Sequence, residues 1–207
     1  KTDPHWEQLN RKHKDKAFHV PPDVDFEALF IADGGRRARL LLPFLSYWDI
    51  ELKTSRAMDP MMFAGKYGGD PPQLVQILGG SGFNNQRFAL KVGAQARNSV
   101  FVDGFWPRSD EAGDFVALWS KRAGRPPSSL AAHAYDAALL MAEASLDQRS
   151  RAETRRALLE TRDRPSVFGP TRVNGSGEVL FGLQILTIQP EIGVVPRGGE
   201  AITNTLN

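Results

Sequence analysis

The segment from Gln73 to Pro107 constrains the fold of this chain more than any other. It reads as a buried strand over Leu74–Leu78, a glycine-rich turn over Gly79–Gly82, a short helix, and a second buried strand over Val100–Val102. Short apolar runs that end at glycine and are separated by a helical segment are typical of parallel α/β units. In such sheets, ligands bind beyond the carboxyl ends of the strands. We therefore expect any binding site to lie in the loops that follow these two strands.

Composition excludes several classes of function. The 207 residues suffice for one large domain or two smaller lobes, and the formal charge of +2 gives no reason to expect nucleic acid as a partner. Because the chain contains no cysteine, thiolate catalysis, disulfides and cysteine-based zinc sites are excluded. The chain begins at Lys1, without an initiator methionine, so we expect it to be part of a larger protein.

The N-terminal part of the chain predicts one strand and one helix before the organising segment. Residues 1–25 are polar and basic, and we interpret them as a basic arm or entry helix. The compact apolar run Phe26–Ala32 predicts a strand, and Arg36–Tyr47 carries apolar residues at helical spacing. The segment Glu51–Pro72 has no clean period, and we expect a long loop or insertion, which is often functional.

The second half of the chain predicts three consecutive helices and then a β segment. Consecutive helices without strands between them are unusual in one doubly wound domain, so we expect the chain to cross to another lobe near Pro107 and to return near Val167. The first predicted helix spans Asp110–Ala123 and stops at Gly124. The second is capped by Ser128 or Ser129 and carries a stripe of small residues that allows close packing on a neighbour, made of Leu130, Ala134, Ala138 and Ala142. The third spans Arg151–Leu159, and a β-like tail follows over Val167–Val195 with a turn at Asn174–Gly177.

The glycine-rich turn does not match two well-known motifs. A dinucleotide-binding fingerprint needs a small residue three places after Gly82, where Asn85 stands. A hydrolase nucleophile elbow needs glycine two places after Ser81, where Phe83 stands. A glycine turn at a helix N-terminus would still offer free N–H groups to a polar or anionic ligand. A tight turn without a ligand fits the sequence equally well.

Patterns for catalysis or metal binding are weak elsewhere. The four histidines are dispersed and have no carboxylate cluster beside them, so we predict no metal site. His133 and Asp136 lie one helical turn apart, but no nucleophile accompanies them, and a surface hydrogen bond is the simpler interpretation. Carboxylates such as Asp33 follow strand ends, where they can act as acid–base groups or as helix caps. We therefore predict no catalytic residue, no cofactor and no enzyme.

Two adjacent aromatic residues, Phe105 and Trp106, come directly after the second strand of the organising segment. Aromatic side chains on a loop that faces a crevice can clamp an apolar or ring-bearing ligand. Packing at a hinge or an interface is the alternative, and the sequence does not choose between them.

Several stretches, taken in order, resemble the second half of type 1 periplasmic binding proteins, whose best-known members are the branched-chain amino-acid receptors. The resemblance covers most of Phe26–Gln189 and implies two α/β lobes, each a parallel sheet flanked by helices, that close on a ligand. DFEALFIAD and VFVDGFWP are also similar to the penicillin-binding-protein activator lipoproteins. The stretches are FEALFIADGGRRARLLLPFL, QLVQILGGSGFNN, SVFVDGFWP, FVALWSKRAGRPPSSLAAHAYDAALLMAEA and GPTRVNGSGEVLFGLQILTIQ.

The resemblance implies a division of the chain into lobes. Residues 26–105 would form the second lobe with an insertion over 51–72, residues 106–165 the helices of an incomplete first lobe, and residues 166–195 a return to the second lobe. Residues 196–207 would be a frayed tail. The sheet of the first lobe would then belong to a missing N-terminal part of the same protein.

The resemblance also implies where a ligand would bind. Second-lobe contacts in this family come from the loop after the first strand, here Asp33 and Gly34, and from the glycine turn, here Ser81 and Gly82. Amino-acid-binding members tend to carry an acidic residue where Ser81 stands. A hydroxyl group cannot supply the charge that pairs with an ammonium group, so Ser81 disfavours binding of an α-amino acid.

The sequence therefore predicts a non-enzymatic protein of the bacterial cell envelope, either periplasmic or anchored in the outer membrane. It would bind a small polar ligand between two hinged lobes and respond by closing. The alternative is a ligand-free scaffold such as a penicillin-binding-protein activator, which regulates cell-wall synthesis through envelope protein partners. Ser81 and the insertion favour the alternative, whereas the glycine turn and the aromatic pair favour ligand binding.

Overall fold

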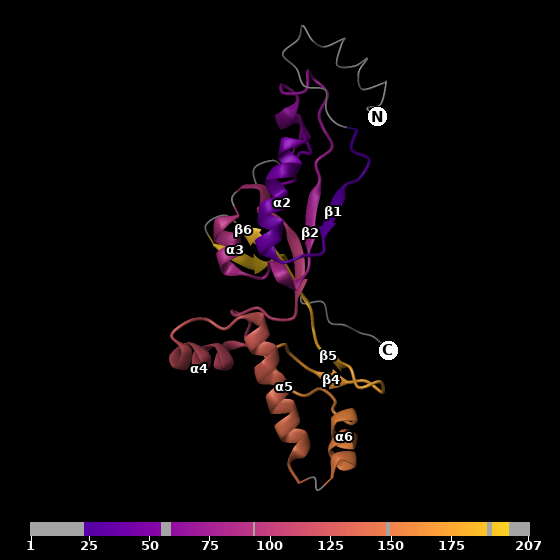
Figure 1. Cartoon of the computed structure of the whole chain (residues 1–207), viewed down its shortest axis with the longest axis vertical. Helices are drawn as coiled ribbons and strands as arrows, with labels where there is room; N and C mark the ends of the chain where they lie inside the picture. Colours follow the sequence, from indigo (N-terminus) through magenta and orange to yellow (C-terminus); the bar gives the residue numbers. More distant parts are fainter. Residues whose placement is uncertain (1–22, 55–58, 93, 148–149, 190–191, 199–207) are drawn as a thin grey trace. The chain divides into compact units, whose positions relative to one another are not determined.

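The computed structural model describes residues 23–54, 59–92, 94–147, 150–189 and 192–198 (Figure 1). The chain divides into two compact units. Unit 1 contains residues 1–101 and 187–195, and unit 2 contains residues 102–186 and 196–207. Most of the basic segment predicted over 1–25, and most of the tail predicted over 196–207, lie outside the described residues.

Unit 1 is built on a five-stranded sheet that is mixed but mostly parallel, which confirms the predicted α/β class. β1 pairs with β2 and β2 with β3, both in parallel, and the two C-terminal strands extend the sheet beyond β3. The chain leaves unit 1 within β3 and re-enters it within β6. In sheet order the strands are β1 (Ala28–Ile31), β2 (Gln76–Gly79), β3 (Val100–Asp103), β6 (Gln184–Gln189) and β7 (Gly193–Pro196).

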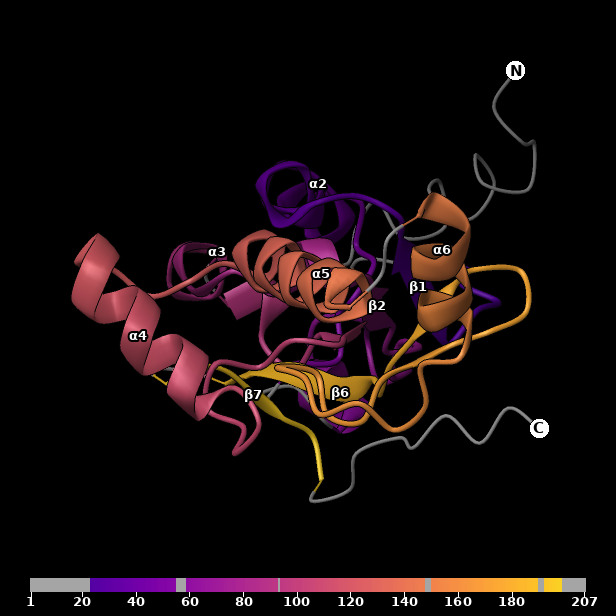
Figure 2. The ribbon, with the colours of Figure 1, turned by 90° about the horizontal axis from the view of Figure 1, so that it is seen from below.

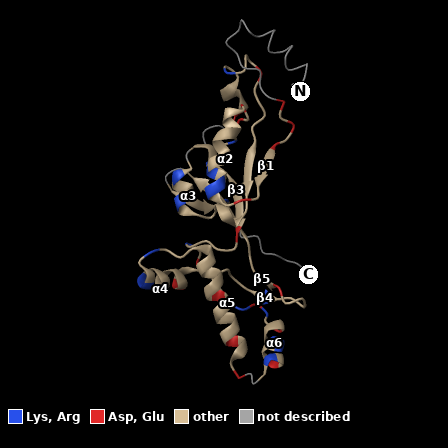
Figure 3. Ribbon diagram, in the orientation of Figure 1, with Lys and Arg blue, Asp and Glu red and all other residues tan. Residues whose placement is uncertain are grey.

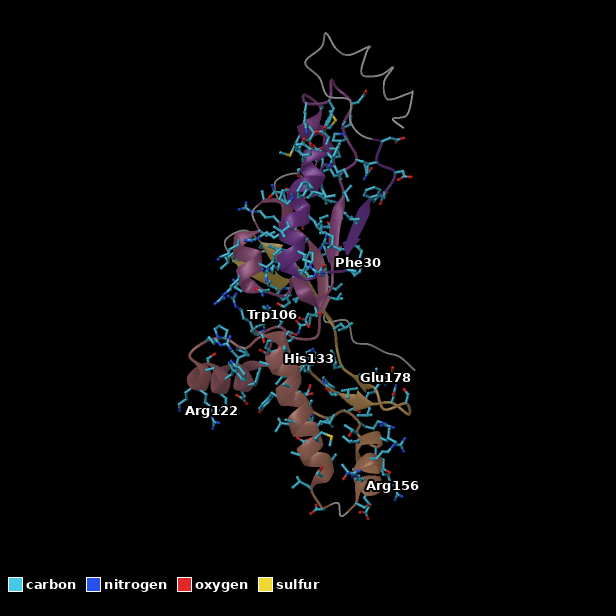
Figure 4. The ribbon with its side chains drawn as sticks, viewed as in Figure 1. Phe30, Trp106, Arg122, His133, Arg156 and Glu178 are labelled. Atoms are coloured by element: carbon cyan, nitrogen blue, oxygen red, sulfur yellow. The ribbon has the colours of Figure 1, made fainter. Side chains whose placement is uncertain are left out.

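Helices α2 (Gly35–Tyr47) and α3 (Gln86–Lys91) lie on the same side of this sheet (Figure 2). Alternation along the strands sends one set of side chains toward them. Ile31 and Phe101 are buried, whereas Phe30 on the other face of β1 is 59% exposed (Figure 4). The core between helices and sheet is aromatic, because Phe83 packs against the rings of Phe88 and Phe101 at centroid distances of 5.2 Å and 5.9 Å.

The segment predicted as a loop or insertion over Glu51–Pro72 is anchored to the end of α2. It contains a short 3₁₀ helix, η1 (Pro60–Phe63). The Lys66 Nζ atom lies 2.7 Å from carboxylate oxygens of both Asp49 and Glu51, and the Tyr67 hydroxyl donates to Glu51 at 2.7 Å. Since Tyr67 is only 4% exposed, this segment contributes to the core rather than extending freely into solvent.

Unit 2 begins with three helices, as the sequence predicts. α4 (Gly113–Ala123) ends at Gly124, whose φ of 64° is the left-handed conformation expected of a helix stop. α5 (Ser129–Ser145) is capped by the Ser128 hydroxyl, which accepts a hydrogen bond from the Ala131 N–H at 3.2 Å. α6 (Arg151–Leu159) has the predicted bounds. A two-stranded antiparallel hairpin of β4 (Arg172–Val173) and β5 (Val179–Leu180) follows.

The small-residue stripe of α5 that the sequence predicts is not the face that packs within the described chain. Leu130 is 78% exposed, and the alanines that continue its stripe are exposed as well. The buried stripe lies two residues further on, and two residues turn a helix by about 200°, to its opposite side. α5 is apolar on almost every side, so its periodicity does not identify the face that packs. The buried residues are Ala132, Asp136, Leu140 and Ala144.

Arg164, in the segment before the hairpin, forms ion pairs with two acidic residues of α5. Its side chain is 9% exposed, and its Nη1 donates to the Asp136 carboxylate at 2.8 Å. Its Nε and Nη2 donate to the Glu143 carboxylate. These hydrogen bonds raise the pKa of Arg164, although burial by itself would lower it. His133 instead stacks on Phe168 at 4.5 Å. Asp136 is therefore engaged in an ion pair with Arg164, and this arrangement does not support a catalytic pair of Asp136 with His133.

Candidate functional site

The loops that follow β1 and β2 touch each other at the carboxyl edge of the unit 1 sheet. Asp33 and Gly34 follow β1, while Ser81 and Gly82 lie in the short helix η2 (Ser81–Phe83) after β2. A Cβ atom added to Gly82 would lie 2.8 Å from the Gly34 Cα atom and 3.3 Å from the Asp33 carbonyl oxygen. Because a real Cβ atom essentially never approaches backbone that closely, only glycine permits this contact. The structure thus brings these four residues together.

Asp33 is held in a defined orientation within this edge. Its carboxylate accepts hydrogen bonds from the Gly34 N–H at 2.7 Å and from Arg37 Nη1 at 3.0 Å. The hydrogen bond from Arg37, followed by that from Gly34, lowers the pKa of Asp33, so the carboxylate is ionised at neutral pH. The edge therefore presents a carboxylate and a guanidinium side by side, with Ser81 exposed on the neighbouring loop.

The sequence suggests that free N–H groups at the start of the helix after the glycine turn could bind a ligand, but in the structure these groups are already hydrogen-bonded. α3 begins at Gln86, four residues after the glycine turn. The Asn85 side chain accepts hydrogen bonds from the N–H groups of Arg87 and Phe88 at 2.9 Å and 3.2 Å. An asparagine cap therefore takes the place of an external anion at this helix end.

The two predicted aromatic residues belong to unit 2. Phe105 is 1% exposed and packs edge-on against Phe115 and Phe168, at centroid distances of 6.1 Å and 6.2 Å. Its place in the core matches the packing alternative, and no ligand can reach its ring in this structure. Trp106 is half-buried (Figure 4). Asp33, Gly34, Ser81 and Gly82 belong to unit 1 instead.

A cavity of about 460 Å³ lies within unit 2, between α5, α6 and the hairpin. This cavity was not predicted from the sequence. One signal was present: Leu158 and Leu159 close α6, a helix whose other residues are mostly polar. His133 and Arg155 add polar groups to a wall that is otherwise mainly apolar. The apolar side chains include Leu140, Met141, Leu158, Leu159, Phe168 and Phe181.

Two features are absent from the described residues. Their histidine, aspartate and glutamate side chains form no group of three or more that could hold a metal ion. The helices of the described ranges include none that is long and apolar enough to cross a bilayer.

Comparison with known proteins identifies the fold. No protein-family model and no curated protein sequence matches the chain. Solved structures do match, and they show that the chain has the α/β fold of type 1 periplasmic binding proteins of the branched-chain amino-acid class. The chain spans about half the length of these structures. The resemblance seen in the sequence is thereby confirmed for the fold.

Three of these structures illustrate the match. The leucine-binding protein LivK of Thermotoga maritima aligns with a TM-score of 0.60 at 16% identity, over 83% of this chain and 43% of its own. LivJ of Streptococcus pneumoniae, solved with isoleucine, aligns with a TM-score of 0.57 at 24% identity, over 94% of this chain and 49% of its own. A solute-binding protein of Rhodopseudomonas palustris, solved with 3,4-dihydroxybenzoic acid, aligns with a TM-score of 0.57 at 16% identity, over 90% of this chain and 45% of its own. All three are named as binding proteins, and none as an enzyme.

Proposed function

We propose that the carboxyl edge of the unit 1 sheet is one wall of a binding site for a small polar ligand, in a non-enzymatic solute-binding protein of the cell envelope. One observation carries this proposal: Gly82 and Gly34 hold the loops after β1 and β2 in backbone contact, next to an ionised aspartate. Polar groups that converge at the carboxyl ends of parallel strands are the usual setting of a ligand site.

The chemistry of this wall limits the ligand. Asp33 is already paired with Arg37, and Ser81 offers a hydroxyl where amino-acid receptors tend to carry an acid. We propose a ligand with several hydrogen-bonding groups, such as a cell-wall fragment, in preference to a free α-amino acid. Binding would shift the whole two-lobed protein toward its closed state, to the extent that the ligand prefers that state. Its place of action would be the periplasm or the outer membrane.

The neighbouring glycines of the turn give a matched test. Gly82→Ala forces the two loops apart, whereas a Cβ atom added to Gly80 meets nothing within 4 Å. We would follow the thermal stability of the full-length parent protein against amino acids, peptides and cell-wall fragments. A ligand at 100 times its Kd should add about 2.7 kcal/mol to the stability. Gly82→Ala should abolish this gain and Gly80→Ala should keep it. Equal responses of the two variants would refute the proposed wall.

Substitutions of the polar groups extend the test. Asp33→Leu removes the carboxylate, and Ser81→Trp fills the space above the turn, so each should reduce the affinity for the ligand at least tenfold. A scaffold without a ligand would be indifferent to both. Isothermal titration calorimetry with the compound found in the stability screen separates these outcomes.

A ligand-free scaffold of the penicillin-binding-protein activator type is the second candidate. The observation in its favour is that Met61 and Met62 are 60% and 63% exposed on the segment anchored by Lys66. Adjacent exposed methionines are typical of adaptable protein-binding surfaces. Met61→Ser together with Met62→Ser should then release an envelope partner in a pull-down, without changing the response to any small molecule.

We also propose that the apolar cavity of unit 2 packs against a further, N-terminal part of the same protein. The resemblance to type 1 periplasmic binding proteins implies that residues 106–165 are helices of the first lobe, whose sheet would belong to that further part. A fluorescent hydrophobic dye should bind the 207-residue chain and should lose this binding in the longer parent protein. Equal dye binding by the two would contradict the proposal and leave the cavity as a small-molecule site.

A further inference from the structure

Helix α2 carries two apolar faces, and only one of them packs on the sheet of unit 1. Ala38 and Leu42 face the core and are fully buried. The opposite side of the helix carries a second apolar stripe at the spacing of successive turns, and all of its members are exposed. We refer to this stripe as the outer face of α2. It consists of Leu40, Leu41, Phe44, Tyr47 and Trp48, which are 59%, 49%, 62%, 75% and 69% exposed.

This outer face is large enough for a protein contact. Phe44, Tyr47 and Trp48 are each roughly two-thirds exposed. An aromatic side chain contributes about 150–250 Å² when it is buried, so these three supply on the order of 400 Å². A standard protein interface buries about 800 Å² per partner. The two leucines and the surrounding rim can provide much of the remainder.

The charges along α2 are arranged asymmetrically. Its first turns carry Arg36, Arg37 and Arg39, and the helix contains no acidic residue (Figure 3). Its other end carries the partial negative charge of the helix dipole, and Asp49 follows directly. Arg37 is also paired with Asp33, yet its side chain remains 75% exposed. The outer face is therefore basic at the start of α2 and aromatic at its end, where Asp49 is paired with Lys66.

We propose that the outer face of α2 binds the same face of a second copy of this chain, with the two helices antiparallel. A two-fold axis near Leu42 and Pro43 would place the basic start of each helix against the aromatic end of its partner. Arg37 would then lie over Trp48 of the second copy, an arrangement that gains cation–π energy. Leu41 would pack against Phe44 of the second copy. Each contact occurs twice, as an isologous interface requires.

The same asymmetry disfavours a lipid surface as the occupant. An interfacial helix that binds anionic lipid carries cations along its polar side. Here the cations of α2 gather at its start, and the carboxylates of Asp49 and Glu51 near its end are paired with Lys66. An anionic membrane would attract one end and gain little at the other. A second copy satisfies both ends.

The absence of cysteine allows a direct test of the antiparallel register. Arg37→Cys and Trp48→Cys are made as separate variants of the 207-residue chain, then mixed with a short thiol crosslinker. The mixture should give a crosslinked dimer. Each variant alone should give little, because its two thiols would be separated by about 16 Å along the helix axis. Crosslinking that is equal in all three samples, or absent from all of them, would overturn the proposed pairing.

The mass of the chain in solution provides the second test. Sedimentation equilibrium should show a dimer whose dissociation constant rises at least a hundredfold in Phe44→Glu. Leu130→Glu, at another exposed leucine, is the matched control and should leave dimerisation unchanged. Circular dichroism confirms that both variants are folded. A monomeric parent chain would refute the proposal, and so would binding to anionic vesicles that Phe44→Glu abolishes in such a monomer.

Discussion

The ion pair between Arg164 and Asp136 gives the sharpest energetic prediction. Both side chains are nearly buried, at 9% and 7% exposed, and their atoms approach to 2.8 Å. Arg164→Met leaves the Asp136 carboxylate buried without its cation, and such a loss costs about 3–5 kcal/mol. Glu143 accepts from the same guanidinium but is 52% exposed, so Glu143→Gln should cost less than about 1 kcal/mol.

A double variant separates the ion pair from the packing around it. Asp136→Leu combined with Arg164→Met removes both charges and should be far more stable than the two single losses added together predict. Urea denaturation gives the free energies of unfolding. Since the chain has two units, hydrogen exchange of the α5 peptides is needed to assign the loss to unit 2. A cost of Arg164→Met no greater than that of Glu143→Gln would contradict the proposed role of the buried ion pair.

Three further predictions concern single side chains. Gly35→Ala would place a Cβ atom within 2.5 Å of the Phe88 ring and should cost about 1–3 kcal/mol in urea denaturation, whereas Gly34→Ala, with open space around it, should cost less. Burial raises the pKa of Tyr67 to about 12, so an ultraviolet titration should show one tyrosine that ionises only near pH 12. The stability that comes from the neutral form of Tyr67 is complete below pH 10 and is lost as the pH rises to 12. A normal titration of all tyrosines would contradict this prediction. Ser128→Ala removes the α5 cap and should cost about 0.5–2 kcal/mol, while Ser128→Asp should restore most of it.

Local signals predict the helices of unit 2 well. The stop at Gly124 and the cap at Ser128 are decided by backbone conformation and by one hydrogen bond within four residues, and both are visible in the sequence. The strands of unit 1 are equally local, since apolar runs bounded by glycine mark β2 and β3. The packing face of α5 is different, because alanine and leucine occur on every side of that helix. Only the partners in the folded unit select it.

The candidate site shows the same division. The loops carrying Asp33 and Ser81 are identified by their place after strands, and parallel pairing of β1 with β2 necessarily brings them to one edge. The sequence cannot reveal that Gly82 touches Gly34, since that contact depends on how closely the two loops pack. Phe105 illustrates the opposite case. An aromatic residue after a strand suits a ligand or a core equally, and only the positions of Phe115 and Phe168 decide for the core.

The order of the strands has a consequence for biosynthesis. β6 lies next to β3 in the sheet, yet residues 102–186 separate the two parts of unit 1 in the chain. At a translation rate of about 5–20 residues per second, the ribosome needs on the order of 4–17 seconds to make that stretch. During this time the edge of β3 has no neighbour to pair with, and unpaired edges invite aggregation. The helices α4, α5 and α6 and the β4–β5 hairpin of unit 2 can form in the interval, and a nascent chain stalled before β6 is the form most dependent on chaperones.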